Sequence, residues 1–467
     1  MVFSSLQFVF IFLPVFLLIY YLVPAHYRNA VLFLGSMVFY TVGAWHEPVY
    51  IVMFLFSILV NYLSAILIER SGHPKLFLTL GLVYDFGWLF VFKYADFFMR
   101  GINSIIGARG GDPLEALGLI LPIGISFYTF QAVSYLVDVY RKDCMAELSF
   151  IDYGAYLSMF PQLIAGPIVK YTTVAERLSD RNPSFNDFVE GLKTFIFGLG
   201  LKVLLANRLG SLWSSVGEVG YDFVSTPLAW LGILSYTFQL YFDFFGYSQM
   251  AIGLGRMLGF DFPKNFNNPY ISRSMTEFWR RWHMTLSGWF RDYVYIPLGG
   301  NRRGTKRTYL NLFIVWFLTG LWHGASVNFI IWGLATFALI AVEKAGFKDV
   351  LDRHPVLSHI WMIFVIQIMW ALFAVTDMHD LGMFLTRLIP IFGSHGAKLF
   401  TTDFVPYLKR FWYLLIIGGI FSTELPYKLY NKIKDNVFGW IFLLAVFWGS
   451  IYCIYRGLND PFLYFRF

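Results

Sequence analysis

One histidine stands in the middle of a long uncharged segment. The stretch TGLWHGAS covers residues 319–326, and from Thr308 to Val342 the sequence has no Asp, Glu, Lys or Arg. A histidine with an ordinary pKa of about 6.5 is mostly neutral at pH 7, so it can accept a proton from a hydroxyl group. Ionisable residues inside a membrane are costly and usually serve a function. His323 is therefore the first candidate for a general base.

The length of this segment predicts a break beside the histidine. As one helix it would extend roughly 52 Å at about 1.5 Å per residue, whereas one crossing covers about 30 Å of hydrocarbon. Gly320 and Gly324 flank His323, and small neighbours let a backbone or a substrate approach the ring closely. The alternative is a neutral imidazole that only binds a backbone carbonyl between helices.

Other kinds of catalytic centre lack their partners in the sequence. Ser326 follows His323 by three residues, but the run contains no acid, and the sequence contains neither a GxSxG nucleophile elbow nor an HExxH zinc motif. Cys144 and Cys453 are too far apart to suggest a disulfide framework or a metal site. These patterns disfavour a covalent enzyme intermediate and predict no metal. Direct transfer of an acyl group to a hydroxyl that His323 deprotonates remains.

A second histidine lies in a basic and aromatic segment. From Lys264 to Arg307 there are nine Lys or Arg and two acids, Glu277 and Asp292. The excess of positive charge predicts a cytoplasmic location, and the many aromatic residues predict short amphipathic helices in the membrane interface. Peripheral binding to anionic lipid would explain the charge, but not His283 within FWRRWH. Glu277 is expected to pair with Arg280 or Arg281.

The composition sets the class of protein in which these residues must work. The chain is 57% hydrophobic and 14% charged, with a mean hydropathy of +0.59, whereas soluble proteins are about a quarter charged. The sequence predicts a polytopic membrane protein with roughly eleven to thirteen crossings or part-crossings. A first span with no preceding Lys or Arg suggests a retained helix with its N-terminus outside. The aromatic content of 21% predicts interfacial belts and rigid internal walls. The apolar runs cover residues 7–23, 30–45, 49–68, 76–99, 117–140, 153–169, 188–206, 223–260, 308–342, 356–376, 381–393, 410–428 and 436–456.

Two of these runs are poor simple helices. The stretch LPIGISFYTF (121–130) contains Pro122 and Gly124, and FPQLIAGPIVK (160–170) contains two prolines and a glycine. Proline removes a backbone donor and clashes with the preceding turn. Broken backbone at membrane depth survives where protein or a cavity satisfies it. We expect re-entrant or kinked elements that line a cavity, with ordinary kinked spans as the alternative.

The combined motifs resemble the membrane-bound O-acyltransferase family. TGLWHGASVNFIIWG (319–333) follows EFWRRWHMTLSGWFRDYVYIPLGGNRRG (277–304), and the bacterial branch with the alginate O-acetylation and teichoic-acid D-alanyl transfer proteins is the most similar. The strong resemblance extends from about residue 121 to 335. The chain departs from the branch pattern FDFSGYSDMAIG at Phe245 and Gln249, where a hydroxyl and a carboxylate are lost. Further matching stretches are SFYTFQAVSYLVDVYR (126–141), FPQLIAGPIVKY (160–171), YFDFFGYSQMAIGLGRMLGF (241–260) and PFLYFRF (461–467).

The resemblance implies a fold and a set of site residues. The fold would be all-α and polytopic, with a ring of tilted transmembrane helices and re-entrant and interfacial helices around a central tunnel. It would form a single domain over residues 1–467. The family's intramembrane histidine falls on His323 as catalytic base, and its second position falls on His283, which would orient the thioester or relay a proton. Candidate substrate contacts are Trp282, Arg280, Arg281, Asn328, Asp243 and Gln239.

The resemblance also implies a reaction. A short acyl group, most simply acetyl, would pass from a cytoplasmic thioester, coenzyme A or carrier phosphopantetheine, to a hydroxyl of a cell-surface polysaccharide or of a relay partner protein. No permanently bound cofactor and no nucleic acid are expected, and the location would be the bacterial cytoplasmic membrane. Arg302, Arg303, Lys306 and Arg307 would attract the anionic donor or pair with lipid phosphate. D-alanyl or longer acyl groups stay open, as do a polysaccharide or lipid exporter, which predicts internal repeats that the sequence lacks, and a non-enzymatic scaffold.

Overall fold

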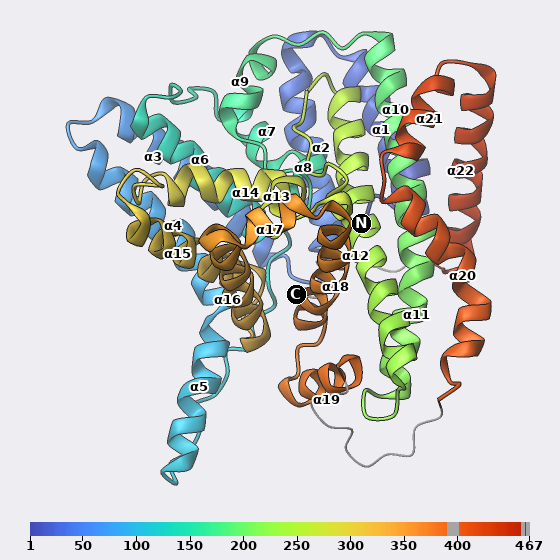
Figure 1. Ribbon diagram of the computed structural model, residues 1–467. Helices are drawn as coiled ribbons and strands as arrows, with labels where there is room; N and C mark the ends of the chain where they lie inside the picture. The colour runs from blue at the N-terminus through green and yellow to red at the C-terminus, as the bar shows by residue number, and fades with distance from the viewer. Residues whose placement is uncertain (390–400, 459–462, 464–467) are drawn as a thin grey trace. The chain divides into compact units, whose positions relative to one another are not determined.

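Helices make up all the regular secondary structure of the described chain. The computed structural model describes residues 1–389, 401–458 and 463, and no strand occurs in these ranges (Figure 1). The all-α prediction is therefore confirmed. The end of the predicted run 381–393 and most of the stretch 461–467 lie outside the described residues. The ring and the central tunnel stay predictions.

The described chain groups into two compact units. The first contains residues Met1–Leu192 and Ala251–Pro263, and the second contains Lys193–Met250 and Lys264–Phe467. The prediction of a single domain over residues 1–467 is not tested by this grouping and stays a prediction.

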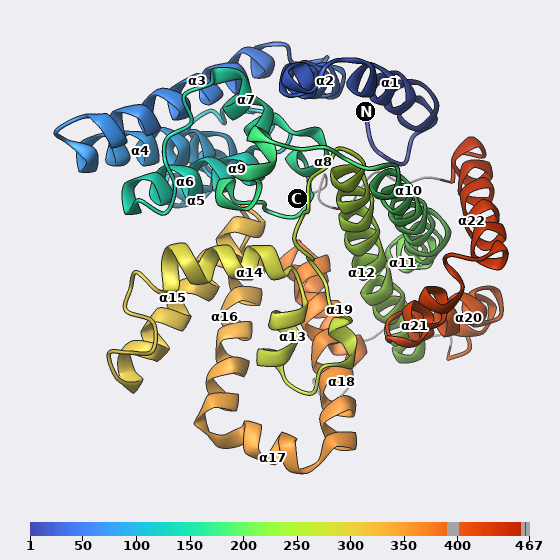
Figure 2. The same ribbon diagram turned by 90° about the horizontal axis from the view of Figure 1, so that it is seen from above.

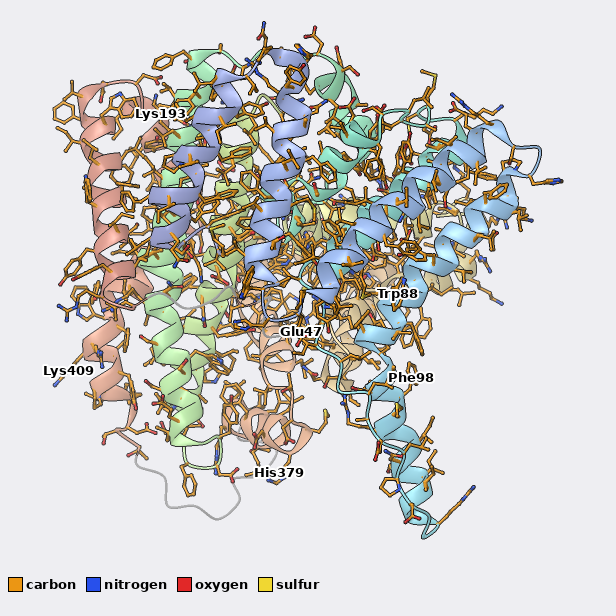
Figure 3. All side chains as sticks on the ribbon, turned by 180° about the vertical axis from the view of Figure 1, so that it is seen from behind. Glu47, Trp88, Phe98, Lys193, His379 and Lys409 are labelled. Atoms are coloured by element: carbon orange, nitrogen blue, oxygen red, sulfur yellow. The ribbon has the colours of Figure 1, made fainter. Side chains whose placement is uncertain are left out.

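The first unit consists of helices, with residues 109–124 as a longer connection between two of them. The helices α3 and α4 lie side by side in both views (Figures 1 and 2). Trp88 on α4 is 36% exposed, and Phe98 on α5 is 49% exposed (Figure 3). The helices of this unit are η1 (Phe8–Phe12), α1 (Leu13–Leu22), η2 (Ala25–Tyr27), α2 (Arg28–Gly43), α3 (Val49–Arg70), α4 (Pro74–Lys93), α5 (Ala95–Ala108), α6 (Ile125–Arg141), α7 (Phe150–Ser158), α8 (Phe160–Leu163), α9 (Tyr171–Ser179) and the start of α10 (Phe185–Gly200).

The second unit contains the basic segment and both candidate histidines. The helices α15 and α16 lie side by side, and α17 joins α16 to α18 as the turn of a helical hairpin (Figure 2). After the end of α10, the helices are η3 (Leu201–Ala206), α11 (Asn207–Val219), α12 (Thr226–Met257), η4 (Pro269–Ile271), α13 (Met275–Arg281), α14 (Met284–Phe290), η5 (Arg291–Tyr295), α15 (Thr305–His323), α16 (Val327–Val342), η6 (Glu343–Phe347), α17 (Lys348–Arg353), α18 (Pro355–Ala374), α19 (Met378–Leu388), α20 (Phe404–Phe421), α21 (Leu425–Ile433) and α22 (Val437–Tyr455). The last residues of α12 belong to the first unit.

Six of the described helical segments are long and apolar enough to cross a membrane. Their outward side chains are largely apolar: on α22 they include Phe438, Ile441, Leu444 and Trp448. So large an apolar surface is unfavourable in water and suits hydrocarbon. The chain is a multi-pass membrane protein, as predicted, and the other predicted runs form shorter or more polar helices. The six segments are Val49–Arg70, Pro74–Lys93, Val327–Arg353, Pro355–Ala374, Phe404–Phe421 and Val437–Tyr455.

The two proline- and glycine-rich stretches break the helices, and they lie against each other in the first unit. Gly124 precedes α6 with φ 75°, a backbone conformation that favours glycine. A Cβ atom at Gly124 would lie 2.6 Å from the carbonyl oxygen of Leu163. The second stretch forms only the short helix α8, and residues 164–170 continue without a helix. Neither stretch is an ordinary kinked span. That the two stretches line a cavity stays a prediction.

Candidate active site around His283 and His323

The hairpin of α15 and α16 places His323 at a break in the helix. His323 is the last residue of α15, residues 324–326 are not helical, and α16 begins at Val327. The predicted break is confirmed. A Cβ atom at Gly320 would lie 2.5 Å from the carbonyl oxygen of Phe329, so the backbones of α15 and α16 touch there, as small residues allow in membrane helices. Gly320 therefore admits a neighbouring backbone close to the histidine.

The imidazole of His323 lies in an aromatic cage. The side chain is 7% exposed. Its ring centroid lies 4.9 Å from that of Trp332 on α16 and 5.1 Å from that of Phe373 on α18, in both cases edge to face. The adjacent Trp322 ring lies 5.0 Å away. Three helices thus fix the orientation of the histidine ring and surround it with apolar surface.

His283 is buried in a strained backbone conformation at the start of α14. It is 1% exposed, with φ 41° and ψ 55° in the left-handed region that residues with a Cβ atom rarely adopt. His283 lies outside the six candidate spans, and burial lowers its pKa to about 3, so the ring is neutral at physiological pH. The ring of Phe244 on α12 packs edge to face against it at 4.6 Å.

Trp322 connects the two histidines. Its ring centroid lies 6.0 Å from that of His283 and 5.0 Å from that of His323. The structure therefore brings the two predicted catalytic residues against one indole within the second unit, although about forty residues separate them in the sequence. Their catalytic assignment stays a prediction.

The predicted aromatic wall is present beside the histidines. Trp282 is buried, and its ring lies 4.9 Å from Trp370 and 5.1 Å from Phe266. Trp279 lies 5.4 Å from Trp332. The indole nitrogens of Trp279 and Trp332 are buried and have no hydrogen-bond partner among the described residues. Trp282 is therefore a wall residue, and its predicted contact with substrate is untested.

The arginines of α13 lie toward the surface. Arg281 pairs with Glu277 at 3.0 Å, as the spacing predicted, and also donates to the carbonyl oxygen of Asn267 at 3.2 Å. Arg280 is exposed. The assignment of the two arginines as substrate contacts stays a prediction. The other predicted basic residues, Arg302, Arg303 and Lys306, are exposed, and Arg307 is half-buried.

The other predicted substrate contacts have structural partners. The Asp243 carboxylate pairs with Lys202 at 2.5 Å, with both side chains at most 3% exposed, and accepts the backbone N–H of Leu463 at 2.8 Å. The Asn328 side chain donates to the carbonyl oxygen of Leu372 at the end of α18. Gln239 lies against Gly210, where a Cβ atom would overlap its amide. The substrate roles of Asp243, Asn328 and Gln239 stay predictions.

Two positions of the site were missed in the sequence. Asn265 accepts a hydrogen bond at 3.0 Å from the ring of His283, and nothing in its local sequence marks it. Glu343 is buried, and its carboxylate accepts the N–H groups of Met275 and Thr276 at 2.5 and 3.0 Å. It thereby caps α13 and fixes this helix to the end of α16. A signal for Glu343 existed, since it is the first acid after the uncharged run.

The departure from the branch pattern at Phe245 adds to the aromatic packing. Its ring is buried and stacks on Tyr241, with centroids 5.3 Å apart and planes at 5°. It also contacts Phe266 and Tyr427. Gln249, the second departure, is half-buried. Phe245 thus supplies an apolar surface where the branch pattern has a hydroxyl.

Comparisons with known proteins identify the family of this chain. Residues 144–376 match the sequence profile of the MBOAT, membrane-bound O-acyltransferase family. The chain is similar to a probable alginate O-acetylase of Azotobacter vinelandii, with 44% identity over 80% of this chain and 75% of that protein. A probable alginate O-acetylase of Pseudomonas aeruginosa is 46% identical over 74% of this chain and 66% of its own length. A peptidoglycan O-acetyltransferase of Helicobacter pylori is 35% identical over 85% of this chain and 81% of that protein.

A more distant relative matches the chain with lower identity and over a shorter part of it. A teichoic acid D-alanyltransferase of Streptococcus thermophilus is 30% identical over 45% of this chain and 54% of that protein. The profile match includes both histidines, the basic segment and the α15–α16 hairpin. The chain therefore belongs to the membrane-bound O-acyltransferase family and is a multi-pass membrane O-acyltransferase, as its motifs predicted.

Proposed function

We propose that this enzyme is an O-acetyltransferase that modifies a cell-surface polysaccharide. The acetyl group comes from a thioester on the cytoplasmic side and is transferred to a hydroxyl of the polymer, or of a partner protein that relays it. The names of the alginate and peptidoglycan relatives, at 35–46% identity over most of the chain, support acetyl and a carbohydrate acceptor. The lower identity and coverage of the D-alanyltransferase favour acetyl over D-alanyl.

One observation carries the mechanism: His323 is a buried base at a helix break in an uncharged hairpin. Its imidazole removes the proton of the acceptor hydroxyl as the oxygen attacks the thioester carbonyl carbon, so that a C–O bond forms. The tetrahedral intermediate then collapses, and the C–S bond breaks. The thiolate leaves with the electron pair and receives the proton from the His323 imidazolium. The ester and the free thiol are the products, and the histidine returns to its neutral form.

The surroundings of His323 suit this reaction. A tetrahedral intermediate carries negative charge on its oxygen, and hydrogen-bond donors in a water-poor site stabilise such charge strongly. The buried indole N–H groups of Trp332 and Trp279 have no protein partner in the described chain and are candidates for this role. His283 is neutral and offers a hydrogen-bonding nitrogen on the other side of Trp322.

The distribution of charge supports the proposed location and donor. The exposed basic residues Arg302, Arg303 and Lys306 lie between η5 and the second turn of α15, and positive segments favour the cytoplasmic side. This orientation gives an anionic donor, acetyl coenzyme A or an acetylated carrier protein, access from the cytoplasm of a bacterial inner membrane. Membership of an enzyme family argues against the exporter and the scaffold.

The test measures ester-bound acetate on the surface polymer. Cells carrying the intact protein, His323→Ala or His323→Gln at matched membrane levels are treated with mild base, and the released acetate is measured per amount of polymer. Loss of a general base is expected to lower transfer by about 10²–10⁴-fold. The matched control is His379→Ala, because His379 is exposed on α19 (Figure 3). Unchanged acetate in both His323 variants would contradict the proposal, and loss of total polymer would favour an exporter.

A further inference from the structure

Asn265 binds the start of α14 through both of its oxygen atoms. It is 1% exposed. Its side-chain oxygen accepts hydrogen bonds from the hydroxyl of Thr285 at 2.9 Å and from the backbone N–H of Thr285 at 3.4 Å. Its side-chain nitrogen donates to the hydroxyl oxygen of Ser248 on α12 at 3.1 Å, and its main-chain carbonyl oxygen accepts the N–H of Met284 at 2.9 Å. The residue thereby connects α12 to the turn that contains His283.

These contacts determine which way the amide faces. A backbone N–H can only donate, so the atom that faces the N–H of Thr285 must be the oxygen of Asn265. The same oxygen lies 3.0 Å from Nδ1 of His283. An amide oxygen only accepts, and therefore Nδ1 of His283 carries the ring proton. In a neutral imidazole the other nitrogen, Nε2, then holds a lone pair and no proton.

Nε2 of His283 is an acceptor without a protein donor. This atom is buried and has no hydrogen-bond partner among the described residues. Phe244 covers one side of the ring, and Trp322, which also contacts His323, lies on another. A buried acceptor that is left unsatisfied is unfavourable, so the site can receive a donor that the described residues do not provide.

The backbone at His283 requires a restraint, which Asn265 supplies. Its left-handed conformation persists only where the surroundings hold it in place. The bond from Met284 N–H to the Asn265 carbonyl and the two bonds from Thr285 hold the residues that directly follow His283. One residue thus fixes both the backbone of His283 and the tautomer of its ring.

We propose that Asn265 is a positioning residue that keeps His283 as the Nδ1–H tautomer, so that Nε2 accepts a hydrogen bond from an O–H or N–H group of the bound substrate. This inference rests on the proposed function, in which His283 takes part in acyl transfer. The step itself forms and breaks no covalent bond.

The contacts of His283 are uncharged, which makes a pH test of its protonation sensitive. Burial lowers the pKa of His283. Its ring contacts Phe244 from α12, the side chain of Asn265 and Trp322 from α15, and none of these is charged. Trp322 also contacts His323. A carboxylate in place of the Asn265 amide would add a charge to these uncharged contacts.

The experiment compares Asn265→Asp, Asn265→Ala and the exposed control Asn267→Ala in the full-length protein. In Asn265→Asp the new carboxylate stabilises the imidazolium and raises the pKa of His283. Below the raised pKa, Nε2 carries a proton and cannot accept. As the pH is lowered from about pH 8 to pH 5, the kcat of acetyl transfer should therefore begin to fall at a higher pH than in the wild type, in which His283 stays neutral and only the base His323 responds. The double variant with His283→Gln should lack this displacement of the acid limb.

Asn265→Ala should lower kcat by about tenfold or more, and the double variant with His283→Gln should be no slower than His283→Gln alone, because coupled residues are not additive. A merely structural Asn265 would give additive losses and an unchanged pH profile, which would overturn the proposal.

A second measurement does not depend on activity. In protein labelled with ¹⁵N-histidine, the signal of His283 is identified by its loss in His283→Gln. The wild type should show a protonated Nδ1 and a bare Nε2, and Asn265→Ala should show the Nε2–H form in part. A protonated Nε2 in the wild type would overturn the proposal. Full activity of His283→Gln would instead contradict the proposed role of His283, and the NMR result would still decide the tautomer.

Discussion

The indole of Trp332 meets the imidazole of His323 edge to face, with ring centroids 4.9 Å apart and planes at 86°. Trp332 is fully buried, and its indole N–H has no partner in the described part of the chain. The same side chain therefore supports the proposed base and holds a hydrogen-bond donor beside it. These two contributions can be separated by substitution.

Trp332→Phe removes the N–H and retains an aromatic ring. If this N–H stabilises the oxyanion, kcat should fall by about tenfold or more, since loss of one such donor costs about 10²–10³ in other enzymes. The measurement is the initial rate of ester formation with purified protein in vesicles. Trp316→Phe, in the same aromatic cluster at 6.3 Å from Trp332, is the control. Equal rates for Trp332→Phe and the wild type would exclude the N–H from catalysis.

The buried His283 should make the protein sensitive to acid. Its pKa is about 3 in the folded protein and about 6.5 when unfolded, so the unfolded state binds the proton first as the pH falls. The free energy of unfolding should therefore decrease between about pH 6.5 and pH 3. Thermal unfolding at about pH 7.5 and pH 4.5 should show a smaller loss for His283→Gln than for the wild type. An equal loss in both proteins would mean that His283 is not the linked group.

Gly320→Ala should disturb the hairpin that carries His323. The added methyl group would lie 2.5 Å from the carbonyl oxygen of Phe329, and overpacking of this kind costs about 1–3 kcal/mol. A shift of α15 relative to α16 changes the distance between His323 and Trp332, so activity should fall more than the amount of folded protein. Gly419→Ala on α20, where a Cβ atom meets nothing within 4 Å, is the matched control. A Gly320→Ala protein with full activity would show that this close approach is dispensable.

The ion pair between Lys202 and Asp243 should be structural. Both side chains are buried, and removal of one partner from a buried pair costs about 3–5 kcal/mol because the other charge stays unpaired. Lys202→Met or Asp243→Asn alone should therefore lower the amount of folded protein sharply. The double variant carries no charge at these two positions. It should therefore recover much of the lost folded protein and also the acetyl-transfer activity. A double variant that folds but is inactive would instead support Asp243 as a substrate contact.

The sequence determined the class of the protein and the identity of the proposed base. Long uncharged runs predict membrane helices because the cost of burying charge in hydrocarbon is a property of each residue. The break beside His323 was predictable for a similar reason, since the uncharged run exceeds one crossing. The short helices of the basic segment and the pair of Glu277 with Arg281 also followed from local spacing.

Only the tertiary structure decided what surrounds each histidine. Asn265 reaches His283, and Glu343 reaches the N-terminus of α13 from 67 and 68 residues away. Asp243 looked like a substrate contact beside a motif, and the structure pairs it with Lys202. Such partners have no local signature, because they depend on which helix faces pack together and on which buried polar groups must then be satisfied. The residue types that can do the chemistry are visible in the local sequence. The tautomer and orientation of these residues arise from contacts between distant segments.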